Sequence, residues 1–185
     1  MTRVVLSIGS NLGDRLARLQ SVVDGLGSAV CAASPVYETA AWGGVEQGPF
    51  LNAVLIAEDP DTDGVGWLRR GQVLEQAAGR VRAQRWGPRT LDVDLVACHA
   101  DGVEMISRED GLTLPHPMAH LRAFVLIPWL DVDPDAVLTV AGLLAEPFST
   151  GFGLVPLYGN DIWLHALLAL VGAYFGWVHR NPTTA

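Results

Sequence analysis

The order in which β-type and helical runs follow one another is the feature that most limits what this chain can fold into. Short stretches rich in β-branched and apolar residues alternate with stretches in which apolar residues recur every three or four positions. The runs read strand, helix, strand, strand, helix, strand over residues 4–8, 16–26, 29–39, 50–58, 63–78 and 90–97. This order predicts an α+β fold, a ferredoxin-like split βαβ sandwich with helices packed on one face of an antiparallel sheet.

The segments outside this pattern are shorter. A weak strand is expected at 103–106 and a short helix at 118–126. Pro128 is expected to limit that helix, because proline has no amide donor and clashes with the preceding turn. Ser10 and Asn11, which follow the first strand, are expected to cap the first helix.

The charged residues exclude one class of nucleotide site. All 12 basic residues are arginine and 20 residues are acidic, which gives a net charge of -8. A Walker P-loop requires a lysine over the β and γ phosphates, so the chain is not a P-loop kinase. A broad nucleic-acid surface is not expected either, because such a surface needs a basic face.

Two features indicate the compartment. Cys31 and Cys98 lie in apolar stretches without metal-ligand spacing, so both are expected to be free, buried thiols in a reducing environment. The apolar run near the N-terminus has only five residues, which is too short for a secretory signal. The sequence therefore predicts a cytoplasmic protein.

The C-terminal part has a different composition, which predicts a domain over 1–142 and an atypical apolar tail over 143–185. Residues 162–178 form a 17-residue run without charge, and a helix is expected at about 161–179. Such a helix spans about 25 Å, slightly less than the hydrocarbon core of a bilayer. The tail resembles the last helix of small multi-span bacterial membrane proteins. Two interpretations stay open: a foreign tail that packs or mediates association, or an anchor that contacts the membrane.

The acidic pair Asp92 and Asp94 is the first candidate for chemistry. In a strand over 90–97 both side chains project from one face while the intervening apolar residues point into the core. Two carboxylates this close repel each other unless a cation lies between them, and hard oxygen ligands suit magnesium. Magnesium completes its shell with water and phosphate oxygens, so the pair predicts a polyphosphate ligand.

Four arginines lie within the ten residues immediately upstream, and their guanidinium groups match phosphate oxygens: Arg80, Arg82, Arg85 and Arg89. Each motif alone also fits a solvated strand face or surface ion pairs. The adjacency of the two motifs favours a phosphate site. Loops 40–49 and 83–88 are candidate lids that would exclude water.

An aromatic residue and an amide share another strand face. Phe50 and Asn52 lie two residues apart, so a flat ring could stack on one and hydrogen bond to the other. The alternative is a core aromatic beside a satisfied amide. On the helix over 63–78, Gln72 and Glu75 are three residues apart and share a face.

From residue 3 to about 140 the chain resembles the 6-hydroxymethyl-7,8-dihydropterin pyrophosphokinase family of folate biosynthesis. The motifs that carry the resemblance are residues 8–14 (IGSNLGD), 50–53 (FLNA), 85–94 (RWGPRTLDVD), 112–116 (LTLPH) and 122–124 (RAF). The family often has a lysine where this chain has Ala83, which places more weight on Arg85.

The resemblance implies an ATP-dependent pyrophosphokinase that transfers diphosphate to the pterin hydroxymethyl group and releases AMP. It implies catalytic roles for Arg80, Arg89, Asp92 and Asp94, the two aspartates also holding two magnesium ions. It implies an ATP site formed by Gln72, Glu75, Arg82, Thr113, His116 and Arg122. It implies a pterin site formed by Trp42, Gly43, Phe50, Asn52, Trp86 and Phe124.

Two other functions stay open at this point. One is a membrane-associated pterin-binding protein whose catalysis is impaired by the foreign tail. The other is a metal-dependent nucleotidyltransferase that uses the same aspartates at the α-phosphorus and releases pyrophosphate.

Overall fold

The computed structural model describes residues 1–42, 46–80, 87–109 and 111–139. All of them belong to the first of two units into which the chain divides, Met1–Val140. The predicted tail helix and the boundary after residue 142 lie outside the described residues. Within the described ranges, none of the helices has the length and hydropathy needed to cross a bilayer.

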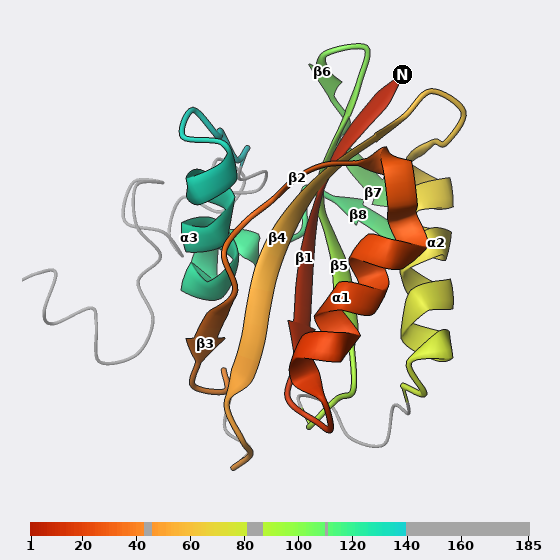
Figure 1. Cartoon of the computed structure of the whole chain (residues 1–185). Helices are drawn as coiled ribbons and strands as arrows, with labels where there is room; N and C mark the ends of the chain where they lie inside the picture. The colour runs from red at the N-terminus through yellow and green to blue at the C-terminus, as the bar shows by residue number, and fades with distance from the viewer. Residues whose placement is uncertain (43–45, 81–86, 110, 140–185) are drawn as a thin grey trace, which may run out of the picture. The chain divides into compact units, whose positions relative to one another are not determined.

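An antiparallel sheet built around β1 (Thr2–Ser10) forms the centre of this unit (Figure 1). β4 (Phe50–Asp59) lies on one side of β1 and β5 (Asp92–Ala100) on the other, and the sheet order is β2-β4-β1-β5-β6. The remaining strands are short: β2 (Val30–Ala33), β3 (Tyr37–Thr39), β6 (Val103–Glu104), and a separate hairpin of β7 (Ser107–Glu109) and β8 (Leu112–Leu114). This arrangement confirms the α+β, ferredoxin-like prediction.

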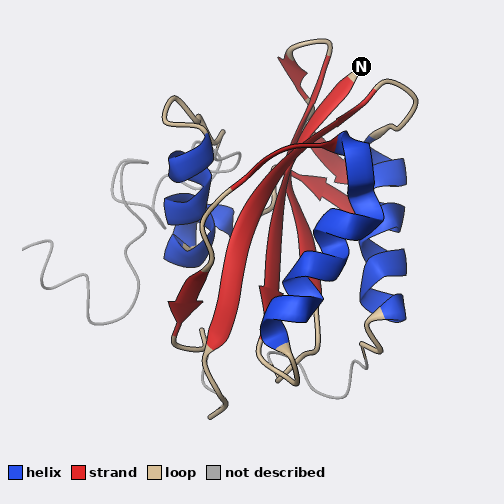
Figure 2. Ribbon diagram, in the orientation of Figure 1, coloured by secondary structure: helices blue, strands red, loops and turns tan. Residues whose placement is uncertain are grey.

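Two helices cover one face of the sheet, α1 (Arg15–Leu26) and α2 (Gly64–Ala77) (Figures 1 and 2). Apolar residues from every second position of the central strands meet them there, and Trp67 of α2 is 1% exposed in this core. Burial of each large side chain contributes about 1.5–3 kcal/mol, so this face is the main source of stability. Two single turns of 3-10 helix, η1 (Gly27–Ala29) and η2 (Ala119–Leu121), join neighbouring elements.

The prediction that helices pack on one face of the sheet is wrong for α3 (Ala123–Val132), which covers the opposite face. The expected end of a helix before Pro128 is also wrong, because α3 continues through it. Val125 and Trp129 flank the proline and are 1% and 3% exposed. Their burial stabilises the helix by about 1.5–3 kcal/mol each, which offsets the roughly 3 kcal/mol cost of an interior proline.

The predicted strand over 29–39 is two strands, because a Ser34-Pro35 step interrupts it. Ser34 donates its N–H to the Val54 carbonyl at 2.9 Å and accepts the Val54 N–H on its hydroxyl at 2.9 Å. Proline has no N–H to continue this ladder, so β3 begins only at Tyr37. β3 then pairs with the start of β4, where the site lies.

The two cysteines differ in accessibility, and the prediction that both are buried is wrong for Cys31. Cys31 is exposed, while Cys98 is fully buried and both are free thiols. Burial raises the pKa of the Cys98 thiol to about 11, so it stays protonated at neutral pH. We expect a disulfide reagent at pH 8 to modify one thiol in the native protein and two in denaturant. Rapid modification of both in the native protein would contradict this burial.

Candidate active site

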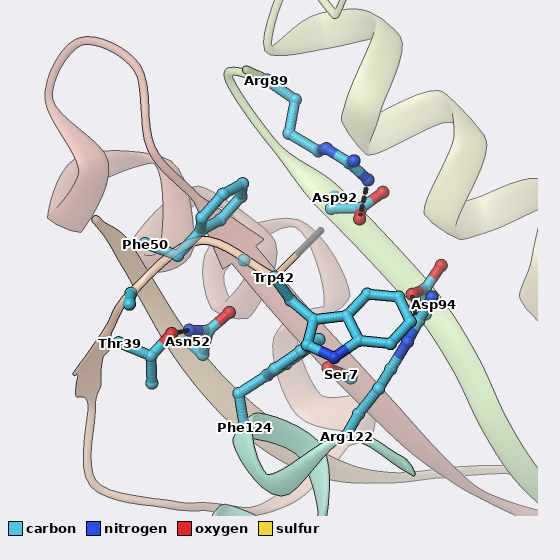
Figure 3. Close-up of a pocket in the computed structure, with 12 residues that line it drawn as sticks. Ser7, Thr39, Trp42, Phe50, Asn52, Arg89, Asp92, Asp94, Arg122 and Phe124 are labelled. Atoms are coloured by element: carbon cyan, nitrogen blue, oxygen red, sulfur yellow. Dashed lines mark hydrogen bonds and ion pairs between the residues drawn. The ribbon is translucent and has the colours of Figure 1, made fainter. Parts of the chain in front are cut away.

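Three neighbouring strands place their polar and small residues on one face to form the floor of the site. Gly9 of β1 pairs with Asn52 of β4 on one side and with Asp92 of β5 on the other, and Ser7 pairs with Asp94. Because side chains alternate along a strand, these residues share the sheet face that α3 covers further along. Figure 3 shows Asn52, Asp92 and Asp94 around the same hollow.

Ser7 and Gly9 are site residues that the sequence reasoning missed. A Cβ at Gly9 would lie 2.9 Å from Oδ1 of Asn52 and 3.7 Å from the Phe50 ring. Glycine therefore leaves room for the amide and the aromatic ring on the next strand. The signal was a glycine inside a β-branched run, which indicates a close approach of a neighbouring group.

A first cleft of about 520 Å³ has aromatic walls. Phe50, Phe124 and Trp42 surround it, and Figure 3 shows their rings around Asn52. Asn52 is 4% exposed and donates through Nδ2 to the Thr39 hydroxyl at 2.9 Å. This bond uses one of the two Nδ2 hydrogens and fixes the amide, so Oδ1 and the second N–H can serve a ligand. Such a cleft fits a flat, polar-edged ring.

A second cleft of about 660 Å³ lies along the outer edge of β5. Its polar lining combines residues from α2, from the loop after it and from the segment around β8: Gln72, Glu75, Arg80, Thr113 and His116. Asp92 and Asp94 line both clefts, so the carboxylates stand where the two meet.

Three arginines pair with these carboxylates. Asp92 contacts Arg80 at 2.6 Å through Oδ1 and Arg89 at 2.5 Å through Oδ2. Asp94 accepts a hydrogen bond from Arg122 at 2.9 Å. The Arg122 guanidinium also lies 5.6 Å from the Trp42 ring centre and 5.7 Å from that of Phe124. The site thus holds its cations and its anions together at the junction of the clefts.

The protonation of the site reflects burial. Burial, and then repulsion from Asp92, raises the pKa of the Asp94 carboxyl. Burial lowers the pKa of His116, so its ring is neutral near pH 7. Its Nδ1 accepts the Met118 N–H at 3.1 Å, which leaves the ring proton on Nε2, 3.9 Å from Asp94.

The donor set suits magnesium. Two hard carboxylates on one strand face repel each other, and a divalent cation relieves that repulsion. No group of three or more metal-ligating side chains occurs in the described ranges. Two carboxylates with phosphate oxygens as further ligands are the usual protein contribution to a magnesium site.

Asn11 joins the two loops that flank the site, and the prediction that it caps the first helix is wrong. Asp14 caps α1 instead, accepting the Ala17 N–H at 3.0 Å. Asn11 is 9% exposed and accepts the Arg89 N–H on Oδ1 at 2.8 Å. Its Nδ2 donates to the Gln47 side chain at 2.9 Å and to the Gly48 carbonyl at 3.2 Å. Because α1 begins only a few residues after Asn11, the local sequence suggests a helix cap at this position.

Replacing Asn11 by alanine is expected to lower the free energy of unfolding by about 1–3 kcal/mol, because three hydrogen bonds of a buried side chain are lost. Asn11→Asp keeps the acceptor for Arg89 but loses both donors, so an intermediate loss is expected. Urea unfolding measures both, with Leu12→Ala as a control at a 41% exposed neighbour. Equal stability of all four proteins would contradict this role.

The structure brings most of the predicted site residues together. Phe50, Asn52, Trp42 and Phe124, which are predicted for the pterin site, line the first cleft. Of the residues predicted for the ATP site, four line the second cleft, namely Gln72, Glu75, Thr113 and His116, whereas Arg122 lines the first. Gly43, Arg82, Ala83, Arg85 and Trp86 lie outside the described residues.

The fold, the shared carboxylates and the arginines around them define a phosphotransfer enzyme. Residues 5–134 match the family model described as 7,8-dihydro-6-hydroxymethylpterin-pyrophosphokinase. The chain belongs to this family of pyrophosphokinases.

Curated relatives agree with this assignment. A protein of Mycobacterium tuberculosis is 70% identical over 147 residues, covering 77% of this chain and 78% of the relative. One of Mycobacterium leprae is 68% identical over 148 residues, with the same coverage. One of Methylorubrum extorquens is 41% identical over 153 residues, covering 79% of this chain and 94% of the relative. Each is named 2-amino-4-hydroxy-6-hydroxymethyldihydropteridine pyrophosphokinase.

The C-terminal region is similar to a different family. Residues 135–178 match the model of a domain of unknown function (DUF4383). The boundary between the two family matches, near residue 135, lies close to the point where the composition of the sequence changes.

Proposed function

We propose that this chain transfers diphosphate from ATP to the hydroxymethyl group of 6-hydroxymethyl-7,8-dihydropterin, giving AMP, in folate biosynthesis. The observation that carries the proposal is that an aromatic cleft and a polar cleft share Asp92 and Asp94. An acceptor in the first and a triphosphate in the second would meet at these carboxylates.

The first cleft supports pterin binding. Phe50, Phe124 and Trp42 offer faces on which a fused ring stacks, and base-like rings gain about 1–3 kcal/mol from such stacking. Asn52 presents its Oδ1 to the donors on the polar edge of the pterin, since Thr39 holds the amide in place through one Nδ2 hydrogen. Gly43 and Trp86 complete this site in the proposal.

The second cleft supports ATP binding. Gln72, Thr113 and His116 line it, and the neutral His116 ring offers an Nε2–H donor for a phosphate oxygen. Arg82 and Arg122 add cations for the phosphates in the proposal. Arginine suits phosphate binding because its planar guanidinium donates two parallel hydrogen bonds to two phosphate oxygens.

In the proposed reaction the hydroxymethyl oxygen of the pterin attacks the β-phosphorus of ATP. The bond between the β-phosphorus and the oxygen bridging it to the α-phosphorus breaks, AMP leaves, and the hydroxyl proton is released. Arg80 and Arg89, which pair with Asp92, would contact the phosphates and stabilise the charge that develops there. Two magnesium ions held by Asp92 and Asp94 would neutralise phosphate charge and orient the transferred group.

Incubation of the protein with magnesium, ATP and the hydroxymethyl dihydropterin tests the proposal. We expect equal amounts of AMP and pterin diphosphate. Release of pyrophosphate in place of AMP would identify a nucleotidyltransferase. Pterin binding without AMP formation would identify a binding protein that has lost catalysis.

We further propose that the catalytic unit works in the cytoplasm and that the tail over 143–185 contacts the membrane. The support is the uncharged apolar run at 162–178. The full chain is expected to sediment with membranes after cell lysis, and a truncation after Gly142 to stay in the supernatant. Recovery of the full chain in the supernatant would overturn the membrane contact.

A further inference from the structure

Glu75 is a charged residue held deep in the unit. Among the described residues that are buried, it alone has a carboxyl side chain, with 6% exposure. A buried carboxylate is costly unless hydrogen bonds and an opposite charge compensate it. Its partners therefore indicate why the position is acidic.

The first partner of Glu75 is the backbone of the catalytic strand. Its Oε1 accepts the Val93 N–H at 2.9 Å, and Val93 lies between Asp92 and Asp94. Along this stretch β5 pairs with β1 on one side. The Val93 N–H points to the other side, toward Glu75. β6 pairs with β5 only at His99 and Ala100. The Glu75 carboxylate thus takes the place of a neighbouring strand at the point between the two aspartates.

The second partner is Arg80. Its Nη1 donates to the same Oε1 of Glu75 and lies 2.6 Å from Asp92. The Arg80 N–H also bonds to the Glu75 carbonyl at 3.0 Å. One carboxylate oxygen thus binds both the strand that carries the acidic pair and a cation beside that pair.

The packing of α2 brings Glu75 to this position. Gly71 lies one turn before Glu75 on the same face of the helix. A Cβ at Gly71 would approach Cγ1 of Val93 to 3.1 Å, which is tighter than ordinary van der Waals contact. Glycine at this position therefore lets the helix lie close enough to β5 for the carboxylate to reach the strand backbone.

We infer that Glu75 is a positioning residue of the catalytic centre, which fixes the backbone between Asp92 and Asp94 and orients the Arg80 guanidinium. It does so from the lining of the second cleft. The inference deepens the proposed function and rests on it for the reaction that is measured.

Two variants separate the contributions of Glu75. Glu75→Ala removes both bonds, and we expect kcat for AMP formation to fall about 100-fold while KM for ATP changes by less than about threefold. Glu75→Gln keeps an acceptor for the Val93 N–H but loses the charge for Arg80, so a smaller fall in kcat, about tenfold, is expected. Gln76→Ala changes an exposed neighbour on the same helix and is the control.

Amide hydrogen exchange of the ligand-free protein provides a readout that does not depend on catalysis. Exchange at Val93 is expected to accelerate in Glu75→Ala and to stay slow in Glu75→Gln and Gln76→Ala. A rise in KM for ATP with unchanged kcat would overturn the inference, because it would indicate a role in ATP binding alone. Unchanged Val93 exchange in Glu75→Ala would overturn it as well. If the wild type forms no AMP, the proposed function fails, whereas the exchange data still decide whether Glu75 positions the strand.

Discussion

Replacing Asp92 by alanine is expected to lower kcat for AMP formation about 1,000-fold, with the fold retained. Its carboxylate lines both clefts and pairs with Arg80 and Arg89, so the change removes a magnesium ligand and the counter-charge of both arginines. The loss of charge stabilisation in a phosphoryl transition state is worth about 4 kcal/mol, which is this factor in rate. Steady-state assays across a magnesium titration measure the effect.

Asp61→Ala provides the matched control, because this carboxylate is exposed in the loop between β4 and α2. Its activity is expected to equal that of the wild type. Far-ultraviolet circular dichroism and thermal melting check that Asp92→Ala remains folded. A folded Asp92→Ala protein with more than one tenth of the wild-type kcat would contradict the assignment of Asp92 to the catalytic centre.

The second large effect is expected for Arg89→Ala, which should lower kcat about 1,000-fold and alter KM for ATP little. Arginines that contact a transferring phosphoryl group contribute about 1,000-fold or more, and their contribution is made chiefly in the transition state. Arg89 is well placed for this role because its N–H is held by Asn11 and its guanidinium by Asp92.

Arg89→Lys separates charge from geometry. Lysine keeps the positive charge but lacks the bidentate fork, so a partial recovery of kcat over the alanine variant is expected. Arg69→Ala, an exposed arginine on the outer part of α2, should behave as the wild type. If Arg89→Ala instead raises KM for the pterin alone, its position 5.9 Å from the Phe50 ring centre would be its functional contact.

The site features that the sequence indicates are those whose neighbours are set locally. Asp92 and Asp94 share a face because a strand repeats every two residues, and the same period places Phe50 beside Asn52. The order of strands and helices predicted the ferredoxin-like sheet for a similar reason. The hydrophobic period of each run is set by the residues of that run and does not depend on the rest of the chain.

The residues that were missed or misassigned depend on contacts between distant segments. Asn11 bonds to residues 36 and 78 positions away, and its sequence context suggested a helix cap. Glu75 is predicted for the ATP site and lines the second cleft, but its bond to Val93, 18 residues further on, is a contact that the local sequence does not indicate. Pro128 lies inside a helix because the opposite face of the sheet buries the residues beside it.

The amino-acid sequence by itself determined the α+β class, the acidic pair with its neighbouring arginines, and the family to which residues 5–134 belong. Only the tertiary structure decided that both faces of the sheet are covered by helices. It also decided that Asp92 and Asp94 stand between two clefts and that Glu75 and Asn11 hold the surrounding segments. The physical reason is that backbone periodicity acts over a few residues, whereas strand register, burial and hydrogen bonds across the sheet exist only once distant segments are packed together.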